Sequence, residues 1–343
     1  MKSTYTLIAL LVLGFLSGCA ERSDPAGPTG IDDAFVLLSQ TQTPGWAEDV
    51  WVYDTLAFVA DGEAGVTIYD ISNLSAPQNV SRLGTSSGAE KVAFSPAANV
   101  ILVNESSGLG GVTFYDYATS GRKKTIFDLG LEEFGFFEVS SDTVIVCEVD
   151  RTEGFKVFTV VYDAQYDDWD ETSIRGAVFS LGGTARGLDF DHEFAYIANN
   201  QLGMRILQIH YSAIANSVTP LGMIDTPGAA RDVALTADKH YTVVADYQCG
   251  ICVIDVSNKD NPRLRGSVTP EKADAIIKVK VIDNTAYFID QHTALYAADV
   301  SNPNAPRLVG KYLAPEPVNL FVTDDQTVFL ADEDLGLLIL KLR

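Results

Sequence analysis

Short runs of alternating or apolar residues recur along the chain, and their β-branched and aromatic side chains favour strands over helices. One such run opens with glycine, as in Gly-Val-Thr-Ile-Tyr-Asp at residues 65–70. Runs of this kind start at positions 65, 111, 154, 203, 250, 294 and 336, with Ala294 in place of glycine in the sixth copy. Successive starts are therefore 42 to 49 residues apart. This spacing over seven copies predicts one β-rich unit repeated seven times.

Three other short runs accompany the glycine run in the first six copies. An apolar run ending in Asp or Asn comes before it, as at residues 56–61, and another short run, such as 49–52, comes earlier still. A turn rich in Asp, Ser, Asn and Pro follows, as at 299–303, and then a fourth run, as at 306–310. Asx side chains cap such turns and proline fixes φ, so the chain reverses there. Four antiparallel strands per unit predict an all-β fold, a seven-bladed β-propeller of four-stranded blades.

The ends of the repeat array predict how the ring closes. The seventh copy stops after its third strand, and residues 34–42 look like a fourth strand without the first three. We expect residues 34–42 to pair with the final strand and complete the last blade, because this pairing removes two open sheet edges. Deletion of residues 31–45 should then cost more stability than deletion of any other loop of that size.

The first 33 residues follow a different pattern. Lys2 precedes an apolar run, residues 7–16, that has the length of a signal peptide and is too short to span a bilayer as a helix. The run ends in Leu-Ser-Gly followed by Cys19, which resembles the lipobox of bacterial lipoproteins. The alternative is a plain secretory signal that happens to contain a cysteine.

The lipobox resemblance implies a domain organisation and a location. Residues 1–18 would be removed as a lipoprotein signal peptide, and Cys19 would carry the lipid. Residues 19–33, rich in Pro and Gly, would form a flexible tether, and residues 34–343 the propeller. Ala20, rather than Asp, implies sorting to the outer membrane, on its periplasmic face or at the cell surface.

The repeats themselves resemble those of the LVIVD-repeat proteins, which are exported or surface β-propellers of bacteria and archaea. The resemblance rests on Ala-Tyr-Phe-Ile-Asp at 286–290, the Asp-Val-Ser-Asn-Pro turn at 299–303 and Pro-Arg-Leu-Val-Gly at 306–310. It is good in copies one, five and six, whereas copies two, three and four depart from the turn pattern. The family implies the fold and brings no firm biochemical activity.

Charge narrows the range of partners. The chain has 46 acidic and 24 basic residues, and its formal net charge is −22. Nucleic-acid binding depends on neutralising phosphates with Lys and Arg, so a nucleic-acid partner is not expected. The acidity serves solubility, or it attracts cations.

Candidate ligand contacts lie where propellers usually bind, on the face that carries the starts of the first strands and the loops between second and third strands. The strand starts contribute Glu48, Asp49, Glu90, Lys91, Glu138, Arg186, Arg231, Asp232, Lys278 and Asn319. The loops add Asp61, Glu63, Glu105, Asp150, Asn199, Asn200, Asp246, Asp290, Asp332, Glu333 and Asp334. The arginines could hold an anionic or sugar ligand and the acids a cation. The alternative for the aspartates that end second strands is turn capping.

The remaining chemistry-bearing residues give weaker signals. The four histidines are scattered over separate copies, no spacing unites them as zinc ligands, and no catalytic motif appears. Cys249 and Cys252 are a possible local disulfide, and Cys147 is expected to be a buried thiol. Residues 162–171 form the longest insertion and echo a calcium loop, but they lack its glycine and its final glutamate, so we expect a solvated hairpin tip. Trp169 there is a candidate contact residue.

Three functions remain open from the sequence. The first is a membrane-anchored, non-catalytic, monomeric propeller that binds an envelope protein or a glycan and uses no cofactor. The second is a propeller hydrolase or lyase that uses carboxylates and arginines of the binding face. The third is a calcium-dependent adhesin, which a null calcium titration by calorimetry would exclude. Fold alone does not decide, because propellers host all three.

Overall fold

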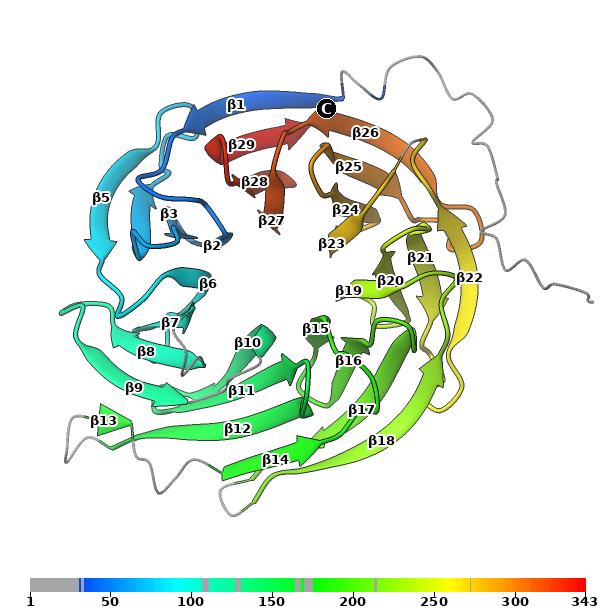
Figure 1. Ribbon diagram of the computed structural model, residues 1–343, viewed down its shortest axis with the longest axis horizontal. Helices are drawn as coiled ribbons and strands as arrows, with labels where there is room; N and C mark the ends of the chain where they lie inside the picture. The colour runs from blue at the N-terminus through cyan, green and yellow to red at the C-terminus, as the bar shows by residue number, and fades with distance from the viewer. Residues whose placement is uncertain are drawn as a thin grey trace, which may run out of the picture.

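The computed structural model describes residues 31, 34–106, 111–126, 131–163, 168–169, 175–212, 215–271 and 273–343. These residues form seven antiparallel sheets arranged as blades around a central axis (Figure 1). The first strand of each blade lies nearest the axis, and the outermost strand forms the rim. The predicted all-β, seven-bladed propeller is therefore confirmed. Within the described residues, no helix has the length and apolar character needed to cross a bilayer.

The first four blades follow one another along the chain. Blade one is β2 (Asp49–Tyr53), β3 (Leu56–Ala60), β4 (Val66–Asp70) and β5 (Gln78–Leu83). Blade two is β6 (Ala89–Ser95), β7 (Val100–Glu105), β8 (Val112–Asp116) and β9 (Arg122–Ile126). Blade three is β10 (Leu131–Ser140), β11 (Thr143–Asp150), β12 (Gly154–Asp163), β13 (Asp168–Trp169) and β14 (Arg175–Phe179). Blade four is β15 (Gly187–Phe190), β16 (Phe194–Ala198), β17 (Met204–His210) and β18 (Ser217–Ile224).

The last three blades complete the ring. Blade five is β19 (Ala230–Leu235), β20 (Tyr241–Asp246), β21 (Gly250–Asp255) and β22 (Arg263–Val268). Blade six is β23 (Ile276–Ile282), β24 (Thr285–Asp290), β25 (Ala294–Asp299) and β26 (Arg307–Leu313). Blade seven is β27 (Pro317–Val322), β28 (Thr327–Asp332), β29 (Gly336–Leu342) and β1 (Phe35–Thr41).

The last blade closes with the N-terminal strand, as predicted. Strand β1 pairs antiparallel with β29, with Phe35 opposite Leu342 and Thr41 opposite Leu337. The Arg343 N–H donates to the Ala34 carbonyl at 2.9 Å just beyond the strands. The pairing gives β29 a neighbour on both sides, so this inner strand has no open edge.

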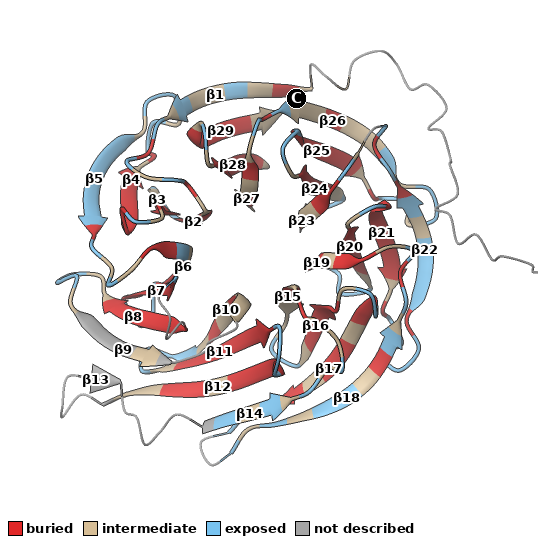
Figure 2. Ribbon diagram, in the orientation of Figure 1, coloured by how far each residue is buried: buried red, intermediate tan, exposed pale blue. Residues whose placement is uncertain are grey.

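Both faces of the inner strands are buried, which explains their nearly continuous apolar runs. In β24, Tyr287 and Ile289 pack against blade seven, whereas Ala286 and Phe288 pack against blade five. Alternate residues of a strand point to opposite faces, so one strand fills both gaps between blades. Figure 2 shows the result, with buried inner strands and largely exposed outer strands such as β5 and β22.

The recurring glycine has a conformational cause. Gly65 has φ +82° as the chain enters β4, and a Cβ there would lie 2.3 Å from the Leu83 carbonyl oxygen. A left-handed conformation and close backbone approach both favour glycine. In the sixth copy, where Ala294 replaces it, the preceding loop takes its positive φ at His292 instead.

Some predictions fall on residues outside the described ranges. The signal peptide, the lipobox with Cys19 and nearly all of the tether lie there. So does most of the 162–171 insertion. Its β13 pairs Trp169 with Tyr162 through the backbone, but the side chain of Trp169 is outside the description.

Candidate binding face at the central channel

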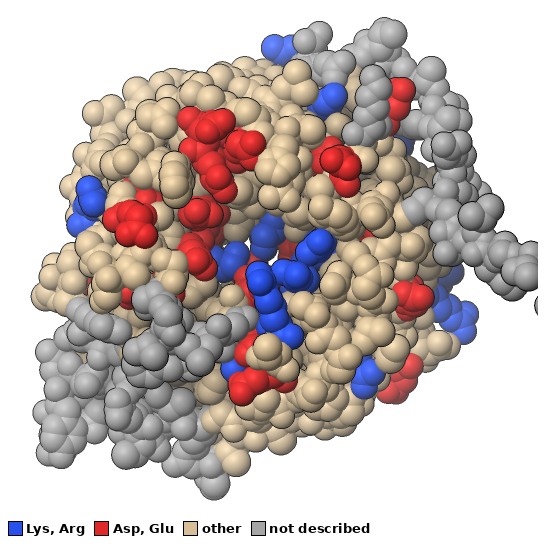
Figure 3. Space-filling view, in the orientation of Figure 1, with Lys and Arg blue, Asp and Glu red and all other residues tan. Residues whose placement is uncertain are grey.

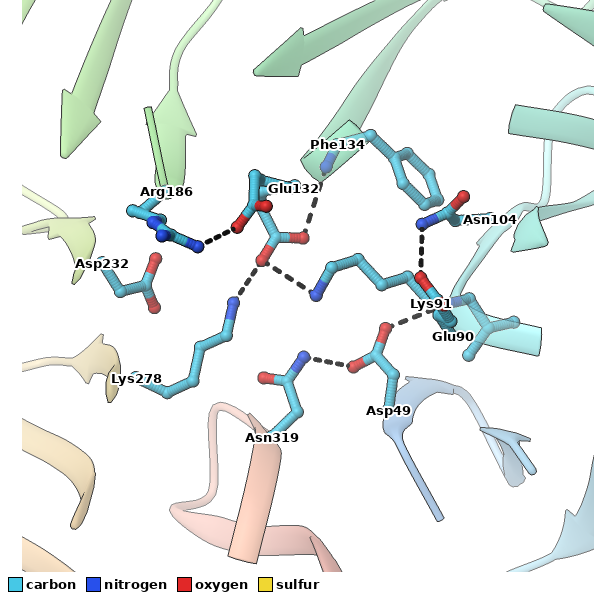
Figure 4. A network of polar contacts seen from close by, with 12 residues as sticks. Asp49, Glu90, Lys91, Asn104, Glu132, Phe134, Arg186, Asp232, Lys278 and Asn319 are labelled. Atoms are coloured by element: carbon cyan, nitrogen blue, oxygen red, sulfur yellow. Dashed lines mark hydrogen bonds and ion pairs between the residues drawn. The ribbon is translucent and has the colours of Figure 1, made fainter. Parts of the chain in front are cut away.

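Charged side chains from several blades meet on the axis of the ring. Glu133 of blade three forms ion pairs with Lys278 of blade six and with Lys91 of blade two, the latter at 3.3 Å. The three side chains are only about 15% exposed. Figure 4 shows the side chains of Lys91 and Lys278 reaching the same carboxylate from opposite sides. The channel is thus bridged by a triad that joins blades distant in sequence.

The triad keeps its central carboxylate ionised. Burial alone would raise the pKa of Glu133, but Lys278 and Lys91 outweigh it and lower the pKa to about 2. Burial would likewise lower the pKa of Lys278, and Glu133 more than offsets it, so that pKa is raised. Buried charges of this kind are tolerated only when they are paired.

An aromatic cluster from the same first strands also spans blades. The Trp51 ring of blade one lies 5.8 Å from the Phe136 ring of blade three and 5.3 Å from the Phe321 ring of blade seven, centroid to centroid. Trp51 lies two residues beyond Asp49 on β2, and Phe321 two beyond Asn319 on β27. The period of two along a strand therefore gives the channel a polar layer followed by an aromatic layer.

Aspartates on the first strands bind neighbouring blades together. Asp49 accepts the Val92 N–H of the next blade at 2.9 Å, and it also accepts a 2.6 Å bond from the Asn319 side chain of blade seven. Asp232 accepts the Val279 N–H of blade six at 3.0 Å. Burial, reinforced by Glu133 and opposed by Lys91, raises the pKa of Asp49 to about 6. The predicted candidate Asp232 therefore lies at a joint between blades.

The four candidate aspartates at the ends of second strands are fully buried. Asp61, Asp246, Asp290 and Asp332 each have 0% exposure. They accept backbone N–H groups of Gly45, Gly228, Ala275 and Glu316, respectively, at 2.8 to 3.1 Å. Each carboxylate thus fixes the segment that leads into the first strand of its own blade, and none presents an open edge to a ligand.

Arg186 and Arg231 lie close together at the mouth of the channel, on blades four and five. Arg186 Nη1 is 2.9 Å from Glu132 Oε2, and Arg151 forms an ion pair with the same carboxylate. The Arg231 guanidinium lies over the Tyr247 ring, 4.3 Å from its centroid. Burial, together with the positive charge of Arg186 and Arg151, lowers the pKa of Arg231. The guanidinium groups of Arg186 and Arg151 therefore share the Glu132 carboxylate, and Arg231 lies near them without an ion pair of its own among the described residues.

The opposite half of the mouth, formed by blades seven, one and two, is acidic. Burial, then Glu333 and Glu90, raises the pKa of Glu48 to about 7. Burial, followed by Glu316 and Asp334, raises the pKa of Glu333. Figure 3 shows this division, with Lys and Arg gathered in the central depression and a group of Asp and Glu to one side of it. The mouth therefore has a basic and an acidic half.

Sequence reasoning misplaced one residue of this face and missed others. Glu138 is at the far end of β10, opposite Val144, where it accepts bonds from Ser95 Oγ and the Ala97 N–H. The expectation that it starts a first strand was wrong, because β10 begins at Leu131 and places Glu132 and Glu133 at the axis instead. The pair Glu132-Glu133 before an alternating run was the available signal. Tyr247 gave none, since it follows a strand like many turn residues.

Cys147 and Cys252 are both free thiols in the core. Cys252 is a free, buried thiol in the middle of β21, so the possible Cys249–Cys252 disulfide is not formed. Its side chain packs in the core between blades four and five, while Cys249 is in the turn before the strand. Cys147 is a buried free thiol. Among the residues that the structure describes, no group of three or more His, Cys, Asp or Glu could hold a metal ion.

Comparison with protein-family models identifies the repeats that the sequence predicted. Residues 44–85, 227–270 and 277–314 match the family model described as LVIVD repeat. These are copies one, five and six, where the resemblance was strongest. No curated protein matches the chain.

Solved structures with the same fold are distant in sequence. The structure of U3-55K is 13% identical, with a TM-score of 0.66 over 91% of this chain and 100% of that one. The WD40 repeats of RRP9 are 13% identical, with a TM-score of 0.65 over 92% and 99%. The computationally designed Ika8 protein is 10% identical, with a TM-score of 0.59 over 88% and 98%. At these identities the likeness shows the propeller fold alone.

Proposed function

Since the chain is an LVIVD-repeat β-propeller, we propose that it is a non-catalytic binding module of the cell envelope. In this proposal, lipid on Cys19 anchors the protein to a membrane, and residues 19–33 hold the propeller away from the surface. The propeller then presents the mouth of its channel to an envelope protein or glycan.

One observation carries the assignment of the binding face. Within the described residues, Arg231 has a buried Nε without a hydrogen-bond acceptor and no carboxylate partner. A partly buried cation without a counter-ion is costly, and a chain with net charge −22 has many acids that could have supplied a partner. A site that lacks a counter-ion of its own is suited to a ligand that brings one.

The engagement of the buried carboxylates supports a non-catalytic role. The four aspartates at the second-strand ends are used by backbone N–H groups, and Asp49 and Asp232 join blades. A general base must be able to reach a proton of its substrate. These carboxylates are turned toward the protein backbone instead.

The test is affinity capture from intact cell envelopes with tagged full-length protein. We expect the native chain and an Arg265→Ala control, altered at the rim of blade five, to retain the same partner. The Arg186→Ala, Arg231→Ala double variant should lose it. Equal capture by the double variant would place the interaction elsewhere and overturn the proposal.

The anchor makes a separate prediction. The native chain should sediment with membranes, and Cys19→Ser should release it into the soluble fraction, because the cysteine is the only attachment point proposed for lipid. Ser23→Ala, in the tether, is the matched control and should stay with the membranes. Retention of Cys19→Ser in the membrane fraction would contradict lipid anchoring.

A hydrolase or lyase is the second candidate, and Glu48 is the observation that favours it. A carboxyl with a pKa near 7 beside Glu90 and Glu333 at a channel mouth has the acid strength of a general acid. Incubation of the purified chain with envelope glycans, followed by measurement of new reducing ends, tests this. Product formation that Glu48→Gln abolishes would replace the binding-module proposal.

A further inference from the structure

We propose that Arg231, with Arg186 beside it, binds the carboxylate of a small ligand whose remaining part is neutral or positively charged. This inference rests on the proposed function, since it names the chemistry recognised at the same face. It is carried by three features of the mouth, namely an unmatched guanidinium, an aromatic support and an acidic wall.

The unmatched guanidinium supplies the attraction. The Nε atoms of both Arg186 and Arg231 are buried and have no acceptor among the described residues. Glu132 forms ion pairs with Arg186 and Arg151, and Oδ2 of Asp232 accepts the Val279 N–H. A carboxylate entering from the mouth would accept from the Nη groups of Arg231, in the two-pronged geometry that guanidinium forms with carboxylates.

Tyr247 fixes the direction of this guanidinium. Its ring lies 4.3 Å below the Arg231 carbon Cζ, and its own N–H donates to the Ala229 carbonyl at 2.9 Å. Contact with the aromatic face holds the guanidinium near the ring. Little side-chain entropy therefore remains to be lost when a ligand binds.

The acidic half of the mouth sets the charge of the rest of the ligand. A group of Asp and Glu side chains lies to one side of the central depression in which Lys and Arg gather (Figure 3). In this half of the mouth, Glu333 and Glu90 add to burial in raising the pKa of Glu48. Charges interact over roughly 8–10 Å at physiological ionic strength. A second negative group on a ligand held at Arg231 would be repelled, and an ammonium group would be attracted. The mouth thus discriminates against polyanions, including nucleic acid and multiply phosphorylated ligands.

Three six-carbon probes test both halves of the site on the full chain. Hexanoate, 6-aminohexanoate and adipate share one carboxylate and differ only at the far end. We expect 6-aminohexanoate to bind most tightly, hexanoate less tightly and adipate most weakly in calorimetric or NMR titrations. Arg231→Gln should weaken 6-aminohexanoate by about tenfold or more, because the two-pronged pair is lost.

Two control variants distinguish a loss of ligand contacts from a loss of folding. Arg231→Lys keeps the positive charge but lacks the paired N–H donors of a guanidinium, so it should weaken binding by less than Arg231→Gln does. Arg265→Gln, which alters an exposed arginine paired with Asp255 on the same blade, should bind like the native chain. Binding that survives Arg231→Gln, or adipate equal to 6-aminohexanoate, would overturn the inference.

Two further carboxylate probes identify the kind of molecule that supplies the carboxylate, and comparison with the envelope capture tests the proposed function separately. Galacturonate and N-acetylglycine represent a sugar acid and a peptide C-terminus, and binding of either at Arg231 supports the inference and identifies the source. Binding of inorganic phosphate with neither carboxylate would overturn it. If all probes fail while envelope capture still depends on the arginines, the inference falls and the binding module stands. If the probes bind but nothing is captured, the reverse holds.

Discussion

Gly187 lies where β15 comes closest to the neighbouring first strand, directly beside the candidate ligand site. A Cβ at this position would be 2.5 Å from both Cα and Oδ1 of Asp232 and 2.7 Å from the Arg231 carbonyl oxygen. The obstacle is mainly backbone, which has no rotamer to change. Blades four and five can therefore approach this closely only with glycine at 187.

We expect Gly187→Ala to lower the free energy of unfolding by about 1–3 kcal/mol, as overpacking does, and to weaken carboxylate binding by shifting Arg231. Gly84→Ala is the matched control, since a Cβ there has no neighbour within 4 Å. Chemical denaturation monitored by circular dichroism measures both. Equal stability of the two variants would show that the blades can separate without cost.

Glu48 makes stability depend on pH. Its pKa is raised in the folded state to about 7 from 4.5, chiefly by burial and then by Glu333 and Glu90. The folded state therefore binds the proton more tightly, so this group's contribution to stability is complete below pH 4.5 and is lost as pH rises through 7.

Glu48→Gln should consequently be more stable than the native chain at pH 8 and nearly equal to it at pH 4. The gain should be about 1–2 kcal/mol, since part of the side chain is in contact with solvent, which screens the effect. Denaturation midpoints at the two pH values measure it. A variant less stable than the native chain at pH 8 would show that the ionised carboxylate is held by a favourable contact.

At the scale of elements, the ring depends on how firmly β1 is held. Phe35 is 7% exposed and packs among Tyr287, Leu320 and Leu340, whereas Leu37 on the same strand is 40% exposed. The two residues share a strand and differ in burial, so they separate side-chain packing from backbone pairing.

We expect Phe35→Ala to destabilise the protein by about 3–4 kcal/mol, because a buried aromatic side chain is removed. Leu37→Ala should cost less than about 1 kcal/mol. Thermal unfolding followed by limited proteolysis near residue 40 gives both the stability and the site of opening. Similar losses for both variants would mean that β1 contributes backbone pairing alone.

The elements were predictable because each repeat uses the same local chemistry. The residue that opens the third strand has a left-handed backbone and lies close to a neighbouring carbonyl, as Gly65 does to that of Leu83. Glycine therefore recurs there at regular intervals that the sequence shows directly. The starts of first strands carry no such requirement. Strand β10 is ten residues long, and its extra length moved the axis position from Glu138 to Glu133. Register of this kind depends on neighbouring strands, which a single repeat does not encode.

For the whole molecule, the candidate site was predictable only in its pieces. Arg186 and Arg231 were identified as residues of one face, and they do lie together. The pairing of Glu133 with Lys278 joins residues 145 positions apart, and only the curvature of the closed ring brings them within reach. The acids at second-strand ends looked available because burial by the preceding linker is not visible in the repeat pattern.

The ion triad links three blades, and its loss should be felt globally. Glu133→Gln leaves Lys91 and Lys278 buried without their counter-ion, so we expect a loss of about 3–5 kcal/mol at pH 7. The pKa of Glu133 is lowered to about 2, so its contribution is complete above 4.5 and is lost as pH falls toward 2. The native chain and the variant should therefore converge in stability under acid.

A double-mutant cycle with Lys278→Met measures the coupling. The second substitution should recover part of the loss, because it removes one of the two uncompensated charges. Additive losses in the two single variants would mean that Glu133 and Lys278 stabilise the ring independently.

Closure by β1 also has a kinetic consequence. Within the blades, most paired strands are neighbours in sequence, so each four-stranded unit can form soon after it is synthesised. Phe35, in contrast, faces Leu342 across about 300 intervening residues, and closing so long a loop is entropically unfavourable. Strand β1 cannot pair until β29 has been synthesised. It is therefore synthesised before the other strands of blades one to seven but is among the last to pair, and the ring stays open during synthesis.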